Sequence, residues 1–402
     1  MSDIVEEARR FIAENWREGI EPNEWRRIVV DARWSVLRWP VDCMGRGLDD
    51  ETAQKVEAVF AAAGVPGPGH DKTNMWAGTI VSAGTPFLRG KFVRPLLLDE
   101  IAMCLLYSEP GAGSDLAGIR TTAVRDGDEW VVNGQKVWTS GARDADYGML
   151  IARTDWDQPK HRGISFFYFP MKQAGVEVRP LRQATGDARF NEVFITDARV
   201  SDDHMLGELN KGWWVLQSAL MYERAVLGIS RRGPRTGTTG KTAAAHGNIP
   251  APDLSLVELA RAVGKNDDPI VRQKLARLYC MRKVNDWNND RSKAAAETGG
   301  SSPTASFGKL AMSGLLHFAG HLQGELLGAE ANLDGDQNPR ARDANYSQLN
   351  AYFTSIGGGT DQIQRNIIGE RILGLPKEPE PERDLPFREV RAGATNERPR
   401  AV

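Results

Sequence analysis

The first segment that could do chemistry is a glycine-containing loop at residues 107–115, which reads YSEPGAGSD. Two glycines flank Ala112, and Ser114 and Asp115 follow directly. Backbone N–H groups in such a loop can cradle a phosphate or the polar edge of a ring, and a serine hydroxyl adds a further donor. The segment does not match GxGxxG, and a loop of this composition can equally be a plain turn. The residues around it must decide between a binding loop and a turn.

A tryptophan beside small hydroxyl residues follows in the segment VWTSG at residues 137–141. Trp138 offers an aromatic face, while Thr139 and Ser140 offer hydroxyl groups, and this combination suits a planar cofactor. The alternative is a half-buried tryptophan that simply packs within a strand. Taken alone, the segment favours that simpler interpretation.

Two other patterns look like known sites but lack required residues. Residues 240–242 (GKT) end like a P-loop, but Arg235 stands where the first glycine is needed and no strand leads in. His317, His321 and Glu325 would share one helix face, yet one helix rarely surrounds a metal and HExxH is absent. We therefore expect no nucleotide hydrolysis and no metal site, and interpret the histidines as a bundle-core or interface cluster.

Changes of periodicity divide the chain that must position these segments. Up to residue 106 apolar residues recur with helical spacing, and the last helix expected in this part spans residues 92–106. Residues 107–207 alternate with a period of two, and Asp126-Gly127 and Asn133-Gly134 are strong signals of hairpin turns. At this spacing we expect antiparallel strands in a small barrel or sandwich.

Helical periodicity returns in residues 208–376, which are predicted to form an antiparallel helical bundle. Residues 377–402 are rich in proline and charge, and we expect a disordered tail. The sequence thus predicts an α+β fold with an N-terminal helical domain (1–106), a middle antiparallel β-barrel domain (107–207) and a C-terminal bundle (208–376). The helices expected in the bundle span about residues 213–231, 253–263, 269–297, 304–330, 341–354 and 361–373.

Composition excludes several classes of protein. The 402 residues include 51 Lys and Arg against 53 Asp and Glu, so no field of one sign is available to hold nucleic acid or an anionic membrane. No apolar run approaches the roughly 18 residues of a membrane span, and the acidic N-terminus is no secretory signal. Three separated cysteines favour a reducing compartment over a disulfide framework or a zinc site. We therefore expect a cytoplasmic protein.

Four segments together resemble the acyl-CoA dehydrogenase family. They are EPGAGSD at 109–115, NGQKVWTSG at 133–141, LIARTD at 150–155 and GGGTDQIQRNIIGERILGLP at 357–376, and the resemblance covers about residues 1–376. It implies FAD in the crevice between the β-domain and the bundle. It also implies oxidation of an acyl-CoA thioester, in which the α-proton is removed and the β-hydrogen leaves as hydride to flavin N5.

The resemblance implies roles for residues around the flavin ring. Tyr107 and Ser108 match positions that hydrogen-bond the pyrimidine edge of the isoalloxazine. Trp138 matches a position that covers one face of the ring, and Ser140 one that lies near N5.

It also implies roles along the rest of the cofactor and the substrate. Ser114, next to Gly113 in the glycine loop, matches a position near the substrate phosphopantetheine or the flavin chain. Thr360 and Gln362 match positions that contact the FAD pyrophosphate and adenine.

The general base is where the sequence departs from the commonest pattern of the family. Most relatives carry Glu immediately before the closing Gly-Thr, where this chain has Gly358. A minority, including isovaleryl-CoA dehydrogenase, place it on the first bundle helix before an Arg, which matches Glu223-Arg224. We predict Glu223 as base and Arg224 as a substrate-binding neighbour, with an exposed helix carboxylate as the alternative. Shielding from water would raise the pKa of the base, and Gly358 could still donate its N–H to the thioester oxygen.

A second departure concerns assembly. Family homodimers complete each FAD site with RxxFG and FGGxG segments; here a basic insertion (230–250) and LGAE (327–330) stand in those regions. This pattern is expected of one subunit of a heteromeric dehydrogenase with an unlike, homologous partner. The alternative is a homo-oligomer in which other groups hold the FAD phosphates, with Arg231, Arg232, Arg235 and Lys241 available.

The sequence therefore predicts an FAD-dependent acyl-CoA dehydrogenase of lipid metabolism and β-oxidation, with electron-transfer flavoprotein as the acceptor. The acyl group stays open. Branched or bulky groups such as sterol side chains are candidates, because the glycines at 357–359 leave room where the usual Glu would stand. A non-catalytic or FAD-sharing partner subunit is one alternative, and an acyl-CoA oxidase or flavin monooxygenase on the same fold is another.

Overall fold

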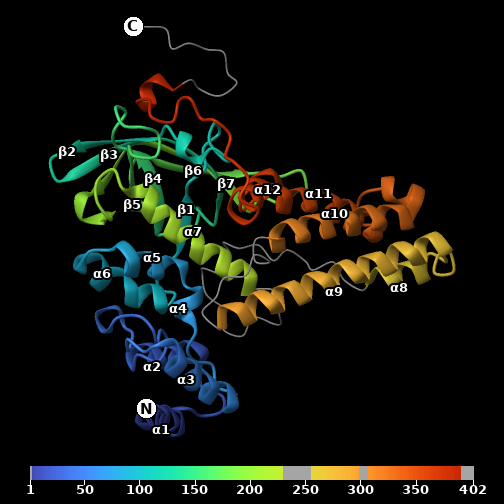
Figure 1. Ribbon diagram of the computed structural model, residues 1–402, viewed down its shortest axis with the longest axis horizontal. Helices are drawn as coiled ribbons and strands as arrows, with labels where there is room; N and C mark the ends of the chain where they lie inside the picture. Colours follow the sequence, from blue (N-terminus) through green and yellow to red (C-terminus); the bar gives the residue numbers. More distant parts are fainter. Residues whose placement is uncertain (1, 230–254, 298–306, 391–402) are drawn as a thin grey trace. The chain divides into compact units, whose positions relative to one another are not determined.

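The protein is described by a computed structural model over residues 2–229, 255–297 and 307–390 (Figure 1). These residues divide into two compact units. The first unit comprises residues 2–181, 188–229 and 380–390. The second comprises residues 182–187, 255–297 and 307–379. The basic insertion, with its GKT segment and its arginines, lies outside the described residues.

The N-terminal part of the first unit is helical, as predicted, and its core is aromatic. Trp16 meets the Trp25 ring edge-on at 4.9 Å between centroids, and Phe11 and Trp34 lie 5.7 Å apart. This cluster accounts for several of the 11 tryptophans as core residues. The helices are α1 (Ser2–Asn15), α2 (Pro22–Asp31), α3 (Asp50–Ala62), α4 (His70–Thr73), α5 (Met75–Ala83) and α6 (Pro86–Leu97).

An eight-stranded sheet follows, in the order β6-β7-β3-β2-β4-β5-β8 with β1 beside β4. Its strands are β1 (Met103–Leu106), β2 (Thr122–Asp126), β3 (Glu129–Ser140), β4 (Tyr147–Arg153), β5 (Ile164–Pro170), β6 (Val176–Leu181), β7 (Phe190–Ser201) and β8 (Met205–Leu206). Strand β5 is buried on both faces. Phe166 and Tyr168 join a core that includes α5 and α6, while Phe167 and Phe169 join a core made by the strands themselves.

The structure corrects the expected helix over residues 92–106. Helix α6 ends at Leu97, and Asp99 adopts a left-handed φ of 56°, which stops the helix. Residues 103–106 instead form β1, which pairs with β4 in parallel, so the sheet is mixed rather than purely antiparallel. A strand buried on both faces is apolar throughout, and such a run cannot be told from a buried helix by periodicity.

The two Gly dipeptides of the β-region behave differently. Asp126-Gly127 turns the chain between β2 and β3, which pair antiparallel as predicted. Asn133-Gly134 is not a turn, because β3 continues through it with a register shift between Val132 and Gly134. A Cβ at Gly134 would lie 2.3 Å from the hydroxyl of Thr121, so the glycine serves a close approach inside a bulged strand.

Helix α7 (Gly212–Ile229) packs in the first unit against α4, α5 and β5. The second unit is helical and has its own core of leucines and alanines. Its helices are α8 (Ser255–Ala262), α9 (Pro269–Glu297), α10 (Gly308–Leu327), α11 (Pro339–Ile356) and α12 (Asp361–Ile367). Over the described ranges, no helix combines the length and the apolar character that a bilayer crossing requires.

The segment expected to be a disordered tail from residue 377 is instead defined as far as Val390. Phe387 is only 3% exposed, and a short turn at Phe387–Glu389 docks on the loop after β4. The buried Phe387 ring, two backbone bonds and an ion pair between Arg388 and Asp157 at 2.6 Å anchor a segment whose overall composition is typical of disorder. Residues 391–402 lie outside the described part of the chain.

Candidate active site

The glycine loop begins where β1 ends and is a tight, hydrogen-bonded turn. The N–H of Glu109 donates to the carbonyl of Ala112 at 2.9 Å, and the N–H of Ala112 donates back at 3.0 Å. A Cβ added at Gly111 or at Gly113 would meet no atom within 4 Å, and neither residue has a left-handed φ. The described chain itself therefore does not require glycine at either position. Glycines of this kind suit a loop that a bound group approaches closely.

A buried ion pair fixes this loop to β3. The Lys136 ammonium, which is fully buried, donates to the Glu109 carboxylate at 2.8 Å and to the Tyr107 carbonyl at 3.1 Å. The other bonds of that carboxylate come from the backbone N–H groups of Arg120 and Thr121. Burial alone would raise the pKa of Glu109, but Lys136 and these N–H donors lower it below its usual value, so the carboxylate stays charged.

Neither partner of this ion pair was among the predicted site residues. Both lie inside the segments that carried the family resemblance, EPGAGSD and NGQKVWTSG. The two residues are 27 positions apart in the chain, and no local pattern pairs them.

Trp138 stands out from the end of β3. The strand has a second register shift between Lys136 and Thr139, and Trp138 inside it has a left-handed φ of 62°. Its side chain is 56% exposed, and its ring meets Phe190 edge-on at 5.9 Å between centroids. A left-handed non-glycine residue costs on the order of 1–3 kcal/mol, and such strain clusters at functional sites. The bulge thus presents one indole face that no described aromatic ring stacks upon.

The loop and the tryptophan are neighbours. The N–H of Val137, directly before Trp138, donates to the carbonyl of Ser108 at 2.9 Å. Beyond the bulge, the Thr139 hydroxyl is buried with no hydrogen-bond partner among the described residues, and Ser140 is half-buried where the strand ends. An open glycine loop, an exposed indole and an unpartnered hydroxyl at one strand end fit a planar cofactor with polar edges, such as FAD.

Two close contacts position α7, the helix that carries the predicted base. A Cβ at Gly212, its first residue, would lie 2.4 Å from the backbone of β5. A Cβ at Gly78 in α5 would lie 2.7 Å from the ring of Tyr222. Glu223 and Arg224 follow within the helix, and their side chains lie outside the described residues. The structure therefore places their backbone on a helix seated against α5, and no more.

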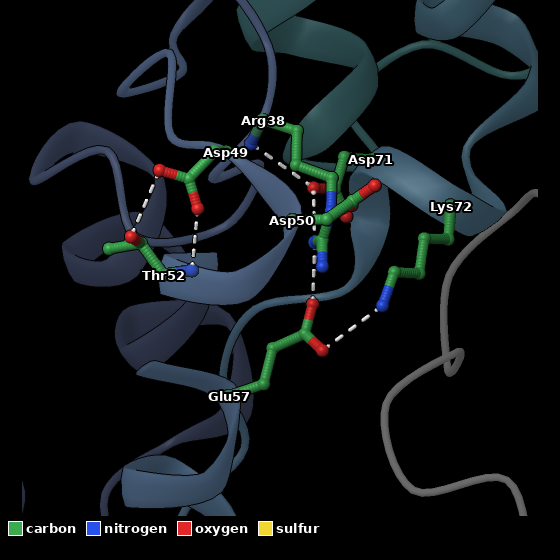
Figure 2. A network of polar contacts seen from close by, with 7 residues as sticks. All are labelled: Arg38, Asp49, Asp50, Thr52, Glu57, Asp71 and Lys72. Carbon is green, nitrogen blue, oxygen red and sulfur yellow. Dashed lines mark hydrogen bonds and ion pairs between the residues drawn. The ribbon is translucent and has the colours of Figure 1, made fainter. Parts of the chain in front are cut away.

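A polar network fixes α4, which also packs on α7 (Figure 2). The Arg38 guanidinium pairs with Asp50, with Glu57 at 2.7 Å and with Asp71 of α4 at 3.1 Å, and Lys72 pairs with Glu57 at 3.0 Å. Burial opposes the charged form of Arg38, but the bonds to these carboxylates raise its pKa above the usual value. Figure 2 shows these side chains converging from α3, α4 and the segment before α3. The network ties α4 to the N-terminal helices.

The remaining predicted residues lie in the second unit, before and in α12. Gly358 and Gly359 have left-handed φ values of 66° and 87°. A glutamate at 358 would be strained there, which explains why the closing loop carries glycine. The Thr360 hydroxyl caps α12 by accepting a bond from the N–H of Ile363 at 3.2 Å, and Gln362 is exposed.

The histidines of α10 have separate partners, and His321 is exposed rather than part of the bundle core. His317 bonds the hydroxyl of Ser355 at 2.7 Å, whereas His321 lies 3.3 Å from Glu325, which also pairs with Lys274. Across the described residues, no group of three or more His, Cys, Asp or Glu side chains is arranged to hold a metal ion.

Comparisons with known proteins give matches over both the β-region and the helical C-terminal part of the chain. The family model of the acyl-CoA dehydrogenase middle domain matches residues 104–198, and that of the acyl-CoA dehydrogenase C-terminal domain matches residues 254–373. The chain is 36% identical over 368 residues to the acyl-CoA dehydrogenase IpdE1 of Mycobacterium tuberculosis, covering 89% of each chain.

Solved structures of similar chains include two that are each named for two components. The ChsE4-ChsE5 complex from Mycobacterium tuberculosis contains a chain that is 30% identical, with a TM-score of 0.63 and coverage of 94% of this chain and 98% of the other. A chain of the Tcur3481-Tcur3483 steroid ACAD is 26% identical, with a TM-score of 0.67 and the same coverage.

Replacing Lys136 by Met should lower the free energy of unfolding by more than the removal of an exposed ion pair does. The substitution leaves the Glu109 carboxylate buried without its cation, and such losses cost about 3–5 kcal/mol. Urea unfolding measures the change. The control is Arg199→Met, which removes ion pairs to Asp126 and Glu129 that are about half exposed and should cost under about 1 kcal/mol. Equal costs for the two variants would contradict the role of the buried pair.

The seating of α7 can be tested with one substitution made at two sites. Gly90→Ala in α6 adds a Cβ into open space and should stabilise the protein by about 0.5–1 kcal/mol, the helix preference of alanine. Gly78→Ala gains the same preference but forces Tyr222 to move, and overpacking of this kind costs about 1–3 kcal/mol. Thermal or urea unfolding gives both values. A Gly78→Ala variant as stable as Gly90→Ala would show that α7 is not seated on α5 by this contact.

Proposed function

The chain belongs to the acyl-CoA dehydrogenase family, whose members use FAD, and we propose that Glu223 is the base in its dehydrogenation of a CoA thioester. The reaction forms a Cα–Cβ double bond in the acyl group. When bound, FAD supplies the acceptor for the β-hydrogen, which leaves as hydride to N5. The other steps fall to residues of this chain.

The observation that carries the proposal is the pairing of the glycine loop with the Trp138 bulge. Tyr107 and Ser108 would hold the pyrimidine edge of the ring, with Trp138 over one face and Ser140 near N5. The loop is already held by the Glu109–Lys136 pair, so these groups need little reorganisation on binding. This arrangement supports a flavin site in the first unit.

The other predicted contacts complete the assignment. Ser114, in the open turn beside Gly113, would meet the phosphopantetheine or the flavin chain. Thr360 and Gln362 of the second unit would contact the pyrophosphate and the adenine. The backbone N–H of Gly358 would donate to the thioester oxygen, where charge develops as the α-proton leaves.

The assignment of the base rests on where a carboxylate can stand. At Gly358 a side chain would need a left-handed backbone, so that position does not favour one. Glu223 follows Tyr222 on α7, and the Tyr222 ring lies against α5. A carboxylate on a packed helix can be kept from water, which raises its pKa toward the working pH. Arg224 beside it would bind substrate.

We also propose a bulky acyl group and an unlike partner subunit. The Tcur3481-Tcur3483 relative is named a steroid ACAD, and ChsE4-ChsE5 is named a complex. The chain lacks the RxxFG and FGGxG segments with which family homodimers complete their FAD sites. We therefore place it in a heteromeric enzyme of the cytosol that oxidises sterol-like side chains in lipid β-oxidation. Electron-transfer flavoprotein would accept the electrons.

Glu223→Gln should abolish dehydrogenation while keeping the cofactor. The amide has the size of the carboxylate but cannot accept the α-proton, and loss of a general base slows reactions about 10²- to 10⁴-fold. The measurement is the bleaching of visible flavin absorbance by CoA thioesters without oxygen, over a panel from butyryl-CoA to a steroid side-chain thioester. Glu208→Gln, an exposed glutamate just before α7, is the control. Bleaching at the wild-type rate in Glu223→Gln would remove this residue from the mechanism.

The partner proposal predicts the colour of the purified protein. Expressed alone, the chain should lose FAD on desalting, because part of the site would be missing. Co-expression with the homologous subunits of the same organism, one at a time, should give one combination that copurifies and stays yellow. A homo-oligomer with one tightly held FAD per chain would contradict the unlike partner and leave the proposed reaction standing.

A further inference from the structure

The C-terminal clamp, which we define as Pro386–Glu389, docks on the loop at residues 154–163 that follows β4. The N–H of Phe387 donates to the carbonyl of Gln158 at 2.9 Å, and the N–H of Arg388 donates to the carbonyl of Trp156 at 3.1 Å. The Phe387 ring is buried, and its centroid lies 5.4 Å from that of Trp156. The clamp is therefore held to the 154–163 loop by two backbone hydrogen bonds and by the buried ring of Phe387.

Directly beneath the Phe387 ring lies the guanidinium of Arg153. Its central carbon is 3.5 Å from the ring centroid, and the residue is 1% exposed. The guanidinium donates to the carbonyls of Ala117 at 2.7 Å, Ile119 at 3.1 Å and Lys160 at 3.2 Å. Within the described residues it forms no direct ion pair, and burial lowers its pKa to about 10. Carbonyl oxygens, the close face of Phe387 and the more distant face of Trp156 at 5.8 Å thus replace water around this cation.

The carbonyls that Arg153 holds belong to the segment that follows the glycine loop. Ala117 and Ile119 come just after Ser114 and Asp115. Lys160, whose carbonyl Arg153 also holds, pairs through its ammonium with Asp115 at 3.1 Å. Arg153 therefore fixes the far end of the glycine loop, just as Lys136 fixes its near end.

The same 154–163 loop also touches the start of α7. His161 meets the Trp213 ring edge-on at 4.8 Å between centroids, and Thr154 donates to the side chain of Asn210 at 2.6 Å. One loop thus contacts the glycine loop on one side and the beginning of the helix that carries Glu223 on the other.

We propose that the C-terminal clamp positions the binding loop: Phe387 seals Arg153 from water, so that Arg153 keeps its bonds to the segment after Ser114. Without the ring, water competes for the guanidinium and the carbonyls it holds, and the glycine loop loses its far anchor. Phe387 would act through Arg153, as a positioning residue. The consequence for FAD and the CoA thioester rests on the proposed function, whereas the clamp itself does not.

The test uses the full-length protein and substitutions that keep the segment apolar. Phe387→Leu retains most of the buried area but removes the aromatic face over Arg153, and Phe387→Tyr retains that face. Leu385→Ala, in the same segment and 38% exposed, is the control. Hydrogen exchange followed by mass spectrometry reports on residues 117–121 and 154–163, with α3 as an internal reference. In the assembled enzyme, the release rate of FAD and the KM for the CoA thioester are measured alongside kcat.

In Phe387→Leu we expect exchange in both segments, FAD release and KM to rise about ten-fold, with kcat little changed and α3 unaffected. Phe387→Tyr and Leu385→Ala should behave as wild type. Unchanged exchange in Phe387→Leu would overturn the clamp. Faster exchange with unchanged FAD release and KM would overturn its link to the site. If the wild-type protein binds no FAD with any partner, the proposed function fails, while hydrogen exchange still decides the clamp.

Discussion

The candidate site of the first unit depends on one buried ion pair, between Glu109 and Lys136. A lysine ammonium with no exposure is tolerated only if its charge is matched and its hydrogen bonds are made. Here the partners are a carboxylate and the carbonyl of Tyr107, and the carboxylate in turn binds two backbone N–H groups. The pair therefore joins the glycine loop, β3 and the start of β2 in one arrangement. Removing either charge leaves the other buried without its partner, which is costly.

Backbone conformation adds a second constraint, and it acts in opposite directions at two positions. At Trp138 a large side chain is kept in the left-handed region, so the bulge is maintained at an energetic cost that packing must offset. At Gly358 the same region is occupied by the residue that adopts it freely. The first position trades stability for an exposed aromatic face. At the second position the backbone favours glycine, which has no side chain, so we propose that the carboxylate is supplied by Glu223 on α7 instead.

Much of the fold followed from the sequence because its signals are local. Helical and strand periodicity gave the sequence of helical, β and helical regions, and the Asp-Gly hairpin formed as expected. The failures were cases in which a distant contact decides the conformation. Gly134 serves its approach to Thr121 rather than a turn. Strand β1 forms because it pairs with β4 and its side chains enter the cores on both faces of the sheet. The segment that ends at residue 390 docks because Phe387 is buried against the loop after β4. Glu109 and Lys136 escaped notice for the same reason, since no local pattern pairs them.

These contacts also explain how a loop rich in glycine can be a precise binding element. Gly111 and Gly113 have no side chains and border open space, so neither residue gives the turn any packing. The loop must therefore be ordered by contacts at its two ends, and a buried cation holds each end. Lys136 bonds the first residue of the loop, and Arg153 bonds the segment that follows it. Lys136 meets a carboxylate, whereas Arg153 has carbonyls and an aromatic ring, which are weaker partners for a charge. The far end is therefore the more sensitive of the two to water. The Phe387 ring of the C-terminal clamp covers Arg153 at this more sensitive end.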